Sequence, residues 1–534
     1  MSQSFNLVRE PWIPCLGKGG NATPILLGLR DALVQAHDLR EVYTDSPLTT
    51  AALMRLMLAV LHRVFGPRDR WEWAKLWQSG RWPSAQLDDY FSAWFDRFDL
   101  FDEQYPFYQV REFQADKLPD LTPVSGLVHE EASGNNVTLF DHHFDAEMRF
   151  LTPDEAARRL VTAQAYAIGL GRSHNFKRKQ RNFLDGPCAR GALFFVEGNS
   201  LFQTLLLSMR KYPIPQGDRR INDRPHDAPA WEQDAPHTDE RTEPYGYLDY
   251  LTWQTWQIRL VAVETAEGVR VTHVRRCMGL ELDKGRVLDP LKSYRIPDRG
   301  EGPSPRGFSE EKALWRESNA LFEMSESNPE GMPQNLAFLS ELVRYEVIPH
   351  QARYKIIATG LATDPRQARN VIFWRQERLP LPTEYLASEE AVERLRSAIQ
   401  MAESVGADLT AARDWLVWLA YVNPTEEKSF ETLRTTRDFQ NKKRQNGRLF
   451  NALPILNRYW WQLDQKFTGI MERLATDEKG GTLKEWSGTL RQAALDAFHE
   501  TVASLQQSGR IIRAAARAEE LLSKYLNYTL ALAE

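Results

Sequence analysis

The chain has 534 residues, of which 42% are hydrophobic and 26% charged, and its formal net charge is −5 at pH 7. Its length predicts two or three domains, and its acidic balance excludes a protein that coats nucleic acid through bulk positive charge. Binding of nucleic acid would have to depend on local basic patches or on a larger assembly. Sixteen tryptophans favour large cores and protein interfaces, so a subunit of a complex is plausible.

The N-terminal sequence and the cysteines indicate the compartment. Residues 1–5 lack a basic start before an apolar stretch, and no run of about 18 apolar residues occurs. Cys15, Cys188 and Cys277 are too widely spaced for a disulfide framework or a paired Cys-x-x-Cys zinc site. We therefore predict a soluble cytoplasmic protein without membrane contact, with buried or incidental thiols, and without cofactor or bound metal.

The first elements predict a helical region behind a short strand. Residues 5–14, FNLVREPWIP, predict a strand that ends in a turn, because proline cannot continue a ladder. A capping Ser46 before Pro47 predicts the start of a core helix, and Gly66 is expected to end it. Aromatic residues then crowd a second helical region, which closes at residues 105–107.

A basic segment follows, which we define as residues 169–181. No carboxylate occurs between Glu155 and Asp185, although seven Lys or Arg residues lie there. Gly169 and Gly171 predict a turn, and the basic residues that follow them are Arg172, Lys177, Arg178, Lys179 and Arg181. Backbone and side-chain donors in this arrangement suit a phosphate chain. The alternative is a solvated basic face next to a turn.

Mixed strands and helices continue to residue 380. Residues 192–196 predict a buried strand and residues 201–209 a helix, whereas residues 213–245 predict a long polar surface excursion. Strand-like sequence resumes at residues 247–263. Two further strands, at 354–359 and 371–374, predict a hairpin around a turn.

The sequence Leu-Pro-Leu-Pro at residues 379–382 predicts a domain boundary, because the chain is almost entirely helical after it. We expect a domain of residues 1–380 and a second one of residues 383–534. Ser388 is expected to cap a helix that Gly406 ends, and further helices follow to residue 531. The predicted fold class is α+β, a large mixed α/β N-terminal domain followed by an all-α C-terminal four-helix bundle.

One string suggests catalysis. Asp141-His142-His143-Phe144-Asp145 offers the ligand types of a metal-dependent phosphoesterase or nuclease. The remaining histidines form no second motif with metal-ligand spacing, and no phosphate-binding loop or nucleophile elbow occurs. We therefore expect no enzyme, and keep the metal-dependent nuclease as an alternative.

Several segments together resemble one family, the CasA-type large subunit of the type I-E CRISPR Cascade surveillance complex. The resemblance covers the whole length and depends on the opening FNLVREPWIP, the aromatic stretch of residues 94–107, and the order of the two domains. It implies a non-catalytic subunit of an RNA-guided antiviral complex. It also implies recognition of the protospacer-adjacent motif (PAM) of double-stranded target DNA, opening of the duplex for the guide RNA, and docking of a helicase-nuclease.

The resemblance also implies DNA contacts. The family's glycine loop falls on residues 168–172, so Gly169, Gly171 and Arg172 are expected at a DNA groove, where glycine lets the backbone approach. Lys177, Arg178, Lys179 and Arg181 are expected along the phosphates. The family's lysine finger aligns with Lys292, on a loop at a strand edge, from which it would reach acceptors in the minor groove. An ordinary solvated lysine is the alternative.

Two more loops match the family. Its glutamine wedge maps to Gln367, beside Arg366 and Ala368, on the turn of the predicted hairpin, where a stiff turn can insert beneath the PAM; an exposed loop is the alternative. Residues 126–145 resemble a loop that contacts the 5′ region of the guide RNA and a neighbouring Cascade subunit, with Phe140 and His142 at the matching positions. The last alternative is a purely structural assembly subunit without DNA contact.

Overall fold

The computed structural model describes residues 4–19, 23–115, 118–127, 150–169, 183–214, 221–234, 241–296, 302–309, 312–323, 331–363, 371–506 and 508–531. The chain forms two compact units. The N-terminal unit comprises residues 1–314 and 320–386, and the helical unit comprises residues 315–319 and 387–534.

Antiparallel sheets organise the N-terminal unit. One has the order β2 (Ile25–Leu27), β1 (Ile13–Gly17), β3 (Leu39–Val42), and a second has the order β11 (Val371–Pro382), β10 (Arg353–Thr363), β5 (Ala192–Glu197). A third has the order β4 (Leu121–Pro123), β7 (Gly268–Met278), β6 (Trp256–Thr265), and β8 (Tyr294–Arg295) pairs with β9 (Ser304–Pro305).

Helices surround these sheets. They are α1 (Leu29–Val34), α2 (Pro47–Phe65), α3 (Arg70–Ser79), α4 (Ser84–Ala93), α5 (Pro153–Tyr166), α6 (Leu201–Leu207), α7 (Tyr247–Leu251), α8 (Gln334–Arg344) and α9 (Glu384–Ala387). Short 3-10 helices cover Phe95–Phe98, Val124–Leu127, Ala230–Glu232 and Leu314–Leu321.

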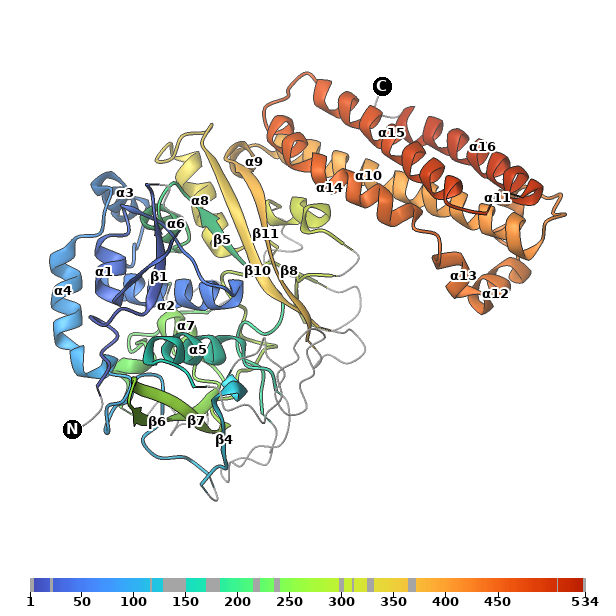
Figure 1. Ribbon diagram of the computed structural model, residues 1–534. Coiled ribbons are helices and arrows are strands. Elements are labelled where there is room, and N and C mark those ends of the chain that lie inside the picture. The colour runs from blue at the N-terminus through green and yellow to red at the C-terminus, as the bar shows by residue number, and fades with distance from the viewer. Residues whose placement is uncertain are drawn as a thin grey trace. The chain divides into compact units, whose positions relative to one another are not determined.

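The core helix α2 is confirmed. Ser46 lies before its first residue, Pro47, and Gly66 follows its last, as the sequence predicts. Of the helices that the structure describes, α2 alone is long and apolar enough to cross a membrane, and 78% of its most apolar window is buried inside the protein. Helix α2 packs against α5 and α7 and so forms the centre of the unit (Figure 1).

The predicted hairpin is confirmed and is longer than expected. Strands β10 and β11 pair from Arg353 and Pro382 up to Thr363 and Val371, and residues 364–370 join them outside the described residues. Strand β5 pairs only with residues 355–360 of β10, so the end of the hairpin extends beyond its neighbour (Figure 1). We call β10 and β11 the long hairpin.

Four long helices form the core of the helical unit, as predicted. They are α10 (Glu389–Val417), α14 (Ile455–Leu474), α15 (Gly481–Ala503) and α16 (Gly509–Ala531); a π-helical turn covers Trp418–Val422, and the short helices are α11 (Phe430–Leu433), α12 (Arg437–Gln445) and α13 (Gly447–Asn451). Residues 315–319 also belong to this unit, where the Trp315 ring stacks on Phe467 with centroids 4.0 Å apart.

Two stretches that contain proline lie in strands, and the first of them overturns a prediction. The first strand begins at Ile13 and includes Pro14. The Pro14 carbonyl accepts from the N–H of Tyr43, the residue that follows β3, at 2.9 Å. The proline nitrogen, which has no hydrogen to donate, therefore faces the end of the β1–β3 pairing. The sequence Leu-Pro-Leu-Pro, at the predicted domain boundary, forms the end of β11, because β11 is an edge strand on which a proline nitrogen can face away from β10. The two units divide after Leu386.

Tertiary contacts overturn two more. Helix α10 continues through Gly406, where a Cβ would lie 2.8 Å from the Trp460 ring, so this glycine provides space for an aromatic neighbour. The strand expected from Tyr247 starts as α7, because the Asp227 carboxylate accepts from the N–H groups of Leu248 and Asp249 at 2.9 and 3.0 Å. Asp227 is buried, although the sequence placed it in a surface excursion.

Candidate nucleic-acid interface

Gly169 is the residue of the basic segment that the structure describes, and it lies at the base of that segment. Its N–H donates to Asp185 Oδ1 at 2.7 Å. A Cβ on Gly169 would lie 2.5 Å from the carbonyl oxygen of Phe183, so the backbone on the two sides of the segment is in close contact. Glycine is therefore required here by the protein's own backbone, whether or not DNA is bound.

Two backbone hydrogen bonds close the same base. The N–H of Gly186 donates to the Ala167 carbonyl at 2.7 Å, and the N–H of Cys188 donates to the Ala165 carbonyl at 2.8 Å. A Cβ on Gly186 would lie 2.6 Å from the Ala165 carbonyl oxygen. Residues 165–169 and 183–188 thus run side by side. Gly171, Arg172, Lys177, Arg178, Lys179 and Arg181 lie outside the described residues.

Asp185 gathers charge at this base. Its Oδ2 accepts from Arg190 Nε at 3.0 Å and lies 3.5 Å from Lys284 Nζ. Burial opposes ionisation of this carboxyl, but Lys284, the Gly169 N–H and Arg190 outweigh burial and hold the pKa of Asp185 below its ordinary value. Asp185 therefore stays ionised and fixes the position of the Gly169 backbone.

Lys284 is a candidate contact that sequence reasoning missed. It lies in a turn at residues 284–286, and its side chain is 43% exposed. Partial burial lowers the pKa of Lys284 to about 8, against the opposing effect of Asp185. The signal in the sequence was weak, because Asp283-Lys284-Gly285 reads as an ordinary surface turn.

Lys284 and Gly169 line one groove of about 510 Å³. Its charge is mixed, with three carboxylates and two cations; the lining residues are Gly169, Phe183, Leu184, Asp185, Arg190, Thr242, Glu281, Leu282, Asp283 and Lys284. The described wall alone is therefore not a strongly basic surface, and the excess of positive charge comes from residues 172–181 of the sequence.

Lys292 lies elsewhere than predicted. It is only 4% exposed, and its Nζ donates to the carbonyl oxygens of Pro187 and Arg190 at 2.7 and 2.6 Å. The expected exposure of Lys292 at a strand edge is thus wrong, and so is the alternative of a solvated lysine. Contact between its ammonium and DNA would require both of these bonds to break.

One stretch of chain, which we call the linking segment (residues 185–197), joins the parts that the sequence singled out. It begins at Asp185, supplies the carbonyls that hold Lys292, and ends as β5, which pairs with β10 of the long hairpin. At Gly191, with φ +77°, it passes so close to β10 that a Cβ on Gly360 would lie 2.6 Å from the Gly191 carbonyl oxygen. Arg366, Gln367 and Ala368 lie on the turn of that hairpin, outside the described residues.

Arg276, on β7, is a second residue that the sequence did not reveal. Its Nη1 donates to the Gly126 carbonyl at 2.6 Å, and its guanidinium lies 5.5 and 4.9 Å from the ring centroids of Phe183 and Trp256. Burial lowers its pKa to about 10. Arg276 therefore holds Gly126, the first residue of the loop 126–145, beside Phe183.

The other predicted positions lie outside the described residues, namely Phe140, His142 and the whole string Asp141-His142-His143-Phe144-Asp145. Within the ranges that the structure describes, no three His, Cys, Asp or Glu side chains gather as they would around a metal ion. The three cysteines are buried free thiols, as predicted.

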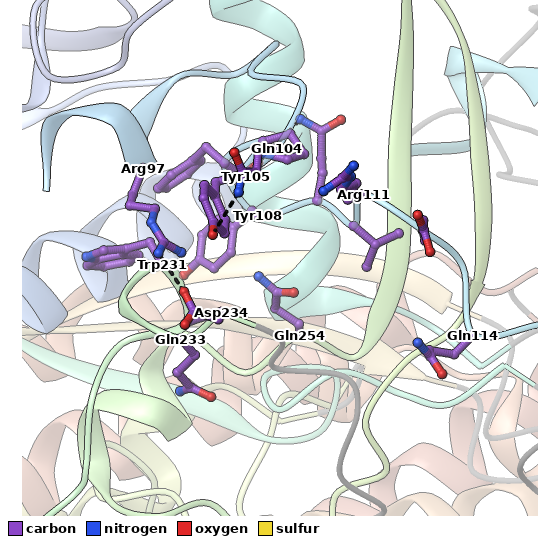
Figure 2. Close-up of a pocket in the computed structure, with 16 residues that line it drawn as sticks. Arg97, Gln104, Tyr105, Tyr108, Arg111, Gln114, Trp231, Gln233, Asp234 and Gln254 are labelled. Atoms are coloured by element: carbon purple, nitrogen blue, oxygen red, sulfur yellow. Dashed lines mark hydrogen bonds and ion pairs between the residues drawn. The ribbon is translucent and has the colours of Figure 1, made fainter.

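A second cavity, of about 270 Å³, lies against residues 104–114 (Figure 2). Two of its polar side chains, Gln109 and Arg97, already bind within the protein. Gln109 donates to the Leu100 carbonyl at 2.7 Å and accepts from the Leu260 N–H at 2.8 Å. Arg97 stacks on the Tyr105 ring at 3.5 Å and pairs with Asp234 at 2.6 Å (Figure 2). These bonds stabilise the wall of the cavity, so we place the candidate site at the linking segment.

Comparison with known proteins identifies relatives over the full length. The sequence profile of the family described as CRISPR-associated protein Cse1 matches residues 6–497. The CRISPR-associated protein CasA/Cse1 of Thermus thermophilus is 31% identical over 538 residues, which cover 98% of this chain and 97% of that protein. The crystal structure of Cse1 from Acidimicrobium ferrooxidans has a TM-score of 0.81 at 23% identity, with 99% of each chain covered. A chain of a CRISPR RNA-guided surveillance complex has a TM-score of 0.74 at 22% identity, with 97% of this chain and 99% of that chain covered.

Proposed function

Because the chain belongs to the CRISPR-associated protein Cse1 family, we propose that it is the large, non-catalytic subunit of an RNA-guided antiviral complex of the type I-E Cascade kind. In this proposal it recognises the PAM of double-stranded target DNA through the minor groove and helps to open the duplex for the guide RNA. It works in the cytoplasm with the other Cascade subunits, contacts the 5′ region of the guide RNA through Phe140 and His142, and docks a helicase-nuclease.

The linking segment is the observation that carries this proposal. PAM recognition and strand opening need groove contacts and a wedge at a fixed separation. The linking segment is bonded to the base of the basic segment at Gly169 and pairs with the long hairpin at residues 355–360. A single backbone stretch thus supports both parts.

We assign the groove contacts to the backbone of residues 169–172 and to Lys284 in place of Lys292. Lys284 is partly exposed and lines the same groove as Gly169, whereas Lys292 is buried. A lysine ammonium can donate to purine N3 and pyrimidine O2 in the minor groove, contacts that discriminate base pairs only in part. Arg172, Lys177, Arg178, Lys179 and Arg181 would bind phosphates, and Arg366, Gln367 and Ala368 would form the wedge.

The proposal is tested with the reconstituted complex and two target duplexes that differ only in the PAM. At one fixed salt concentration, we expect binding of the PAM-bearing duplex to be at least about tenfold tighter, since a mismatched recognition site typically costs 1–3 kcal/mol. Equal affinity for the two duplexes would leave a purely structural subunit.

The nuclease alternative has its own test. The chain and the complex are incubated with duplex DNA and Mg²⁺ or Mn²⁺. We expect no cleavage by the chain alone; cleavage that His143→Ala abolishes would replace the non-catalytic assignment.

The affinity of the complex for PAM-bearing DNA should depend on pH through Lys284. Because its pKa in the free protein is about 8 and the negative potential of the DNA groove raises it, binding above pH 8 must include uptake of a proton. We expect affinity to fall about tenfold between pH 7 and pH 9. Lys284→Arg keeps its charge throughout and should flatten this dependence. Titrations at several pH values check this, and identical slopes for the two proteins would contradict it.

Titration of Lys284 changes the stability of the fold in the opposite direction to its effect on DNA affinity, so the two pH effects can be separated. The pKa of Lys284 in the folded protein lies below its ordinary value of 10.5, so the unfolded chain binds the proton more tightly. The free energy of unfolding should therefore rise with pH between about 8 and 10.5. A loss of DNA affinity in the lower part of that window cannot then come from unfolding caused by Lys284.

A further inference from the structure

The ammonium of Lys292 is the centre of a set of contacts that no DNA-binding role explains. It is buried, and its two bonds go to carbonyls 105 and 102 residues away in the sequence. An ammonium buried without hydrogen bonds would be strongly unfavourable, so the two carbonyls and the lysine stabilise one another. Removal of the ammonium would leave two buried carbonyls without this donor.

The loop that carries Lys292 is itself firmly held. The Asp289 carboxylate accepts from the Leu291 N–H at 2.9 Å, and the Gln334 N–H donates to the Pro290 carbonyl at 2.8 Å. Ser293 Oγ donates to the Gly331 carbonyl at 2.6 Å. Residues 289–293 therefore form a fixed point, and Lys292 extends from it to the linking segment.

The same loop also contacts the linking segment farther along. The Phe194 N–H, on β5, donates to the Leu291 carbonyl at 2.8 Å, and Asn335 donates to the Phe194 carbonyl at 3.0 Å. The linking segment is thus held at residues 187–190 by the Lys292 side chain and at β5 by the backbone of the loop. The first of these attachments lies next to Asp185, and the second lies next to the long hairpin.

We infer that Lys292 is a positioning residue, which holds residues 187–190 so that the base of the basic segment and the long hairpin keep one fixed separation. This inference rests on the proposed function, since that separation matters only if both parts contact the same duplex. Lys292 acts through the protein backbone and does not touch DNA.

The test compares Lys292→Met with the control Lys524→Met in the assembled complex. Methionine fits an apolar buried site but donates no hydrogen bond. The first measurement is amide hydrogen exchange without DNA at Gly186 and Cys188, whose N–H groups close the base of the basic segment. We expect exchange at least about tenfold faster in Lys292→Met and unchanged in Lys524→Met, whose side chain is 68% exposed on α16 of the helical unit.

The second measurement is the ratio of affinities for PAM-bearing and PAM-less duplexes. Lys292→Met should lower this ratio about tenfold, the equivalent of one hydrogen-bonded contact, while its affinity for PAM-less duplex stays that of the wild type. A purely structural lysine would lower the unfolding temperature but leave the ratio unchanged. Lys292→Gln keeps one amide donor and should lie between Lys292→Met and the wild type in both measurements.

The outcomes are distinct. A wild-type ratio in Lys292→Met, or unchanged exchange at Gly186 and Cys188 with a lowered ratio, would overturn the inference; the latter would restore a direct contact with DNA. If Lys292→Met does not fold, Lys292→Gln decides by the same two measurements. If the wild-type complex itself does not distinguish the two duplexes, the proposed function fails and the inference with it, whereas the exchange result still shows whether Lys292 holds the linking segment.

Discussion

Replacement of Asp289 by alanine is expected to destabilise the N-terminal unit by about 3–5 kcal/mol, because it leaves a buried arginine without its counter-charge. Asp289 Oδ2 lies 3.1 Å from Arg55 Nη1, and both side chains are 1% exposed. The same oxygen accepts from the Tyr250 hydroxyl at 2.9 Å. The variant therefore loses the partner of a cation and of a hydroxyl in the centre of the unit.

The measurement is chemical unfolding of the chain, followed by a signal from the N-terminal unit, because the two units need not unfold together. Asp289→Asn keeps a side-chain oxygen but loses the charge, so we expect a smaller loss of stability than in Asp289→Ala. The control is Arg68→Ala, which removes a surface ion pair with Glu72 at 2.7 Å and should cost less than about 1 kcal/mol. An equal free energy of unfolding for Asp289→Ala and Arg68→Ala would show that the buried pair contributes nothing to stability.

The parts of the fold that were predicted from sequence depend on local signals. The start of α2 at Pro47 and its end before Gly66, the strand at residues 192–196 and the hairpin strands around residue 367 follow from caps, breakers and apolar runs. The long C-terminal helices follow from the same signals. These features are determined by residues within a few positions of one another in the sequence, so tertiary contacts alter their positions little.

The predictions that failed depended on neighbours distant in sequence. Pro14 and Pro380 lie in strands because of where a ladder ends or a sheet has its edge, and no local pattern reveals either. Gly406 continues a helix because Trp460 needs the space. Proline and glycine thus occur inside a strand or helix where a tertiary contact favours the backbone geometry or the space that they provide.

The candidate site follows the same rule. The sequence located the basic segment by its lack of carboxylates, and the carboxylate that ends this stretch, Asp185, proves to hold its base. The residues next to a lysine in the sequence do not predict whether its side chain is exposed. Lys292 is buried, and it bonds to carbonyls about a hundred residues away in the sequence. Lys284 lies in a turn that the sequence does not distinguish from an ordinary surface turn, and it lines the groove together with Gly169.

Replacement of Gln367 by alanine is expected to slow opening of the target duplex about 10–100-fold while binding of the closed PAM-bearing duplex changes little. Separation of the first base pairs requires unstacking that costs a few kcal/mol, which a wedge offsets only if its support is stiff. The long hairpin meets this condition. Its strands pair from Arg353 and Pro382 to Thr363 and Val371, and Arg378, opposite Ile357, pairs with Glu41 at 2.9 Å and with Glu197 at 3.4 Å.

The measurement is stopped-flow fluorescence of a base analogue placed next to the PAM, with the reconstituted complex in excess. A target whose first base pairs are mismatched is already open, so on this target the rate of the fluorescence change with Gln367→Ala should equal the wild-type rate. Arg353→Ala, at the other end of the long hairpin, is the control variant and should open both targets at the wild-type rate, since the half-exposed Arg353 side chain bonds to Glu384 and to the Ala352 carbonyl, away from the turn at residue 367. Equal slowing of Gln367→Ala on the closed and the mismatched targets would place the defect in binding and remove the wedge from the mechanism.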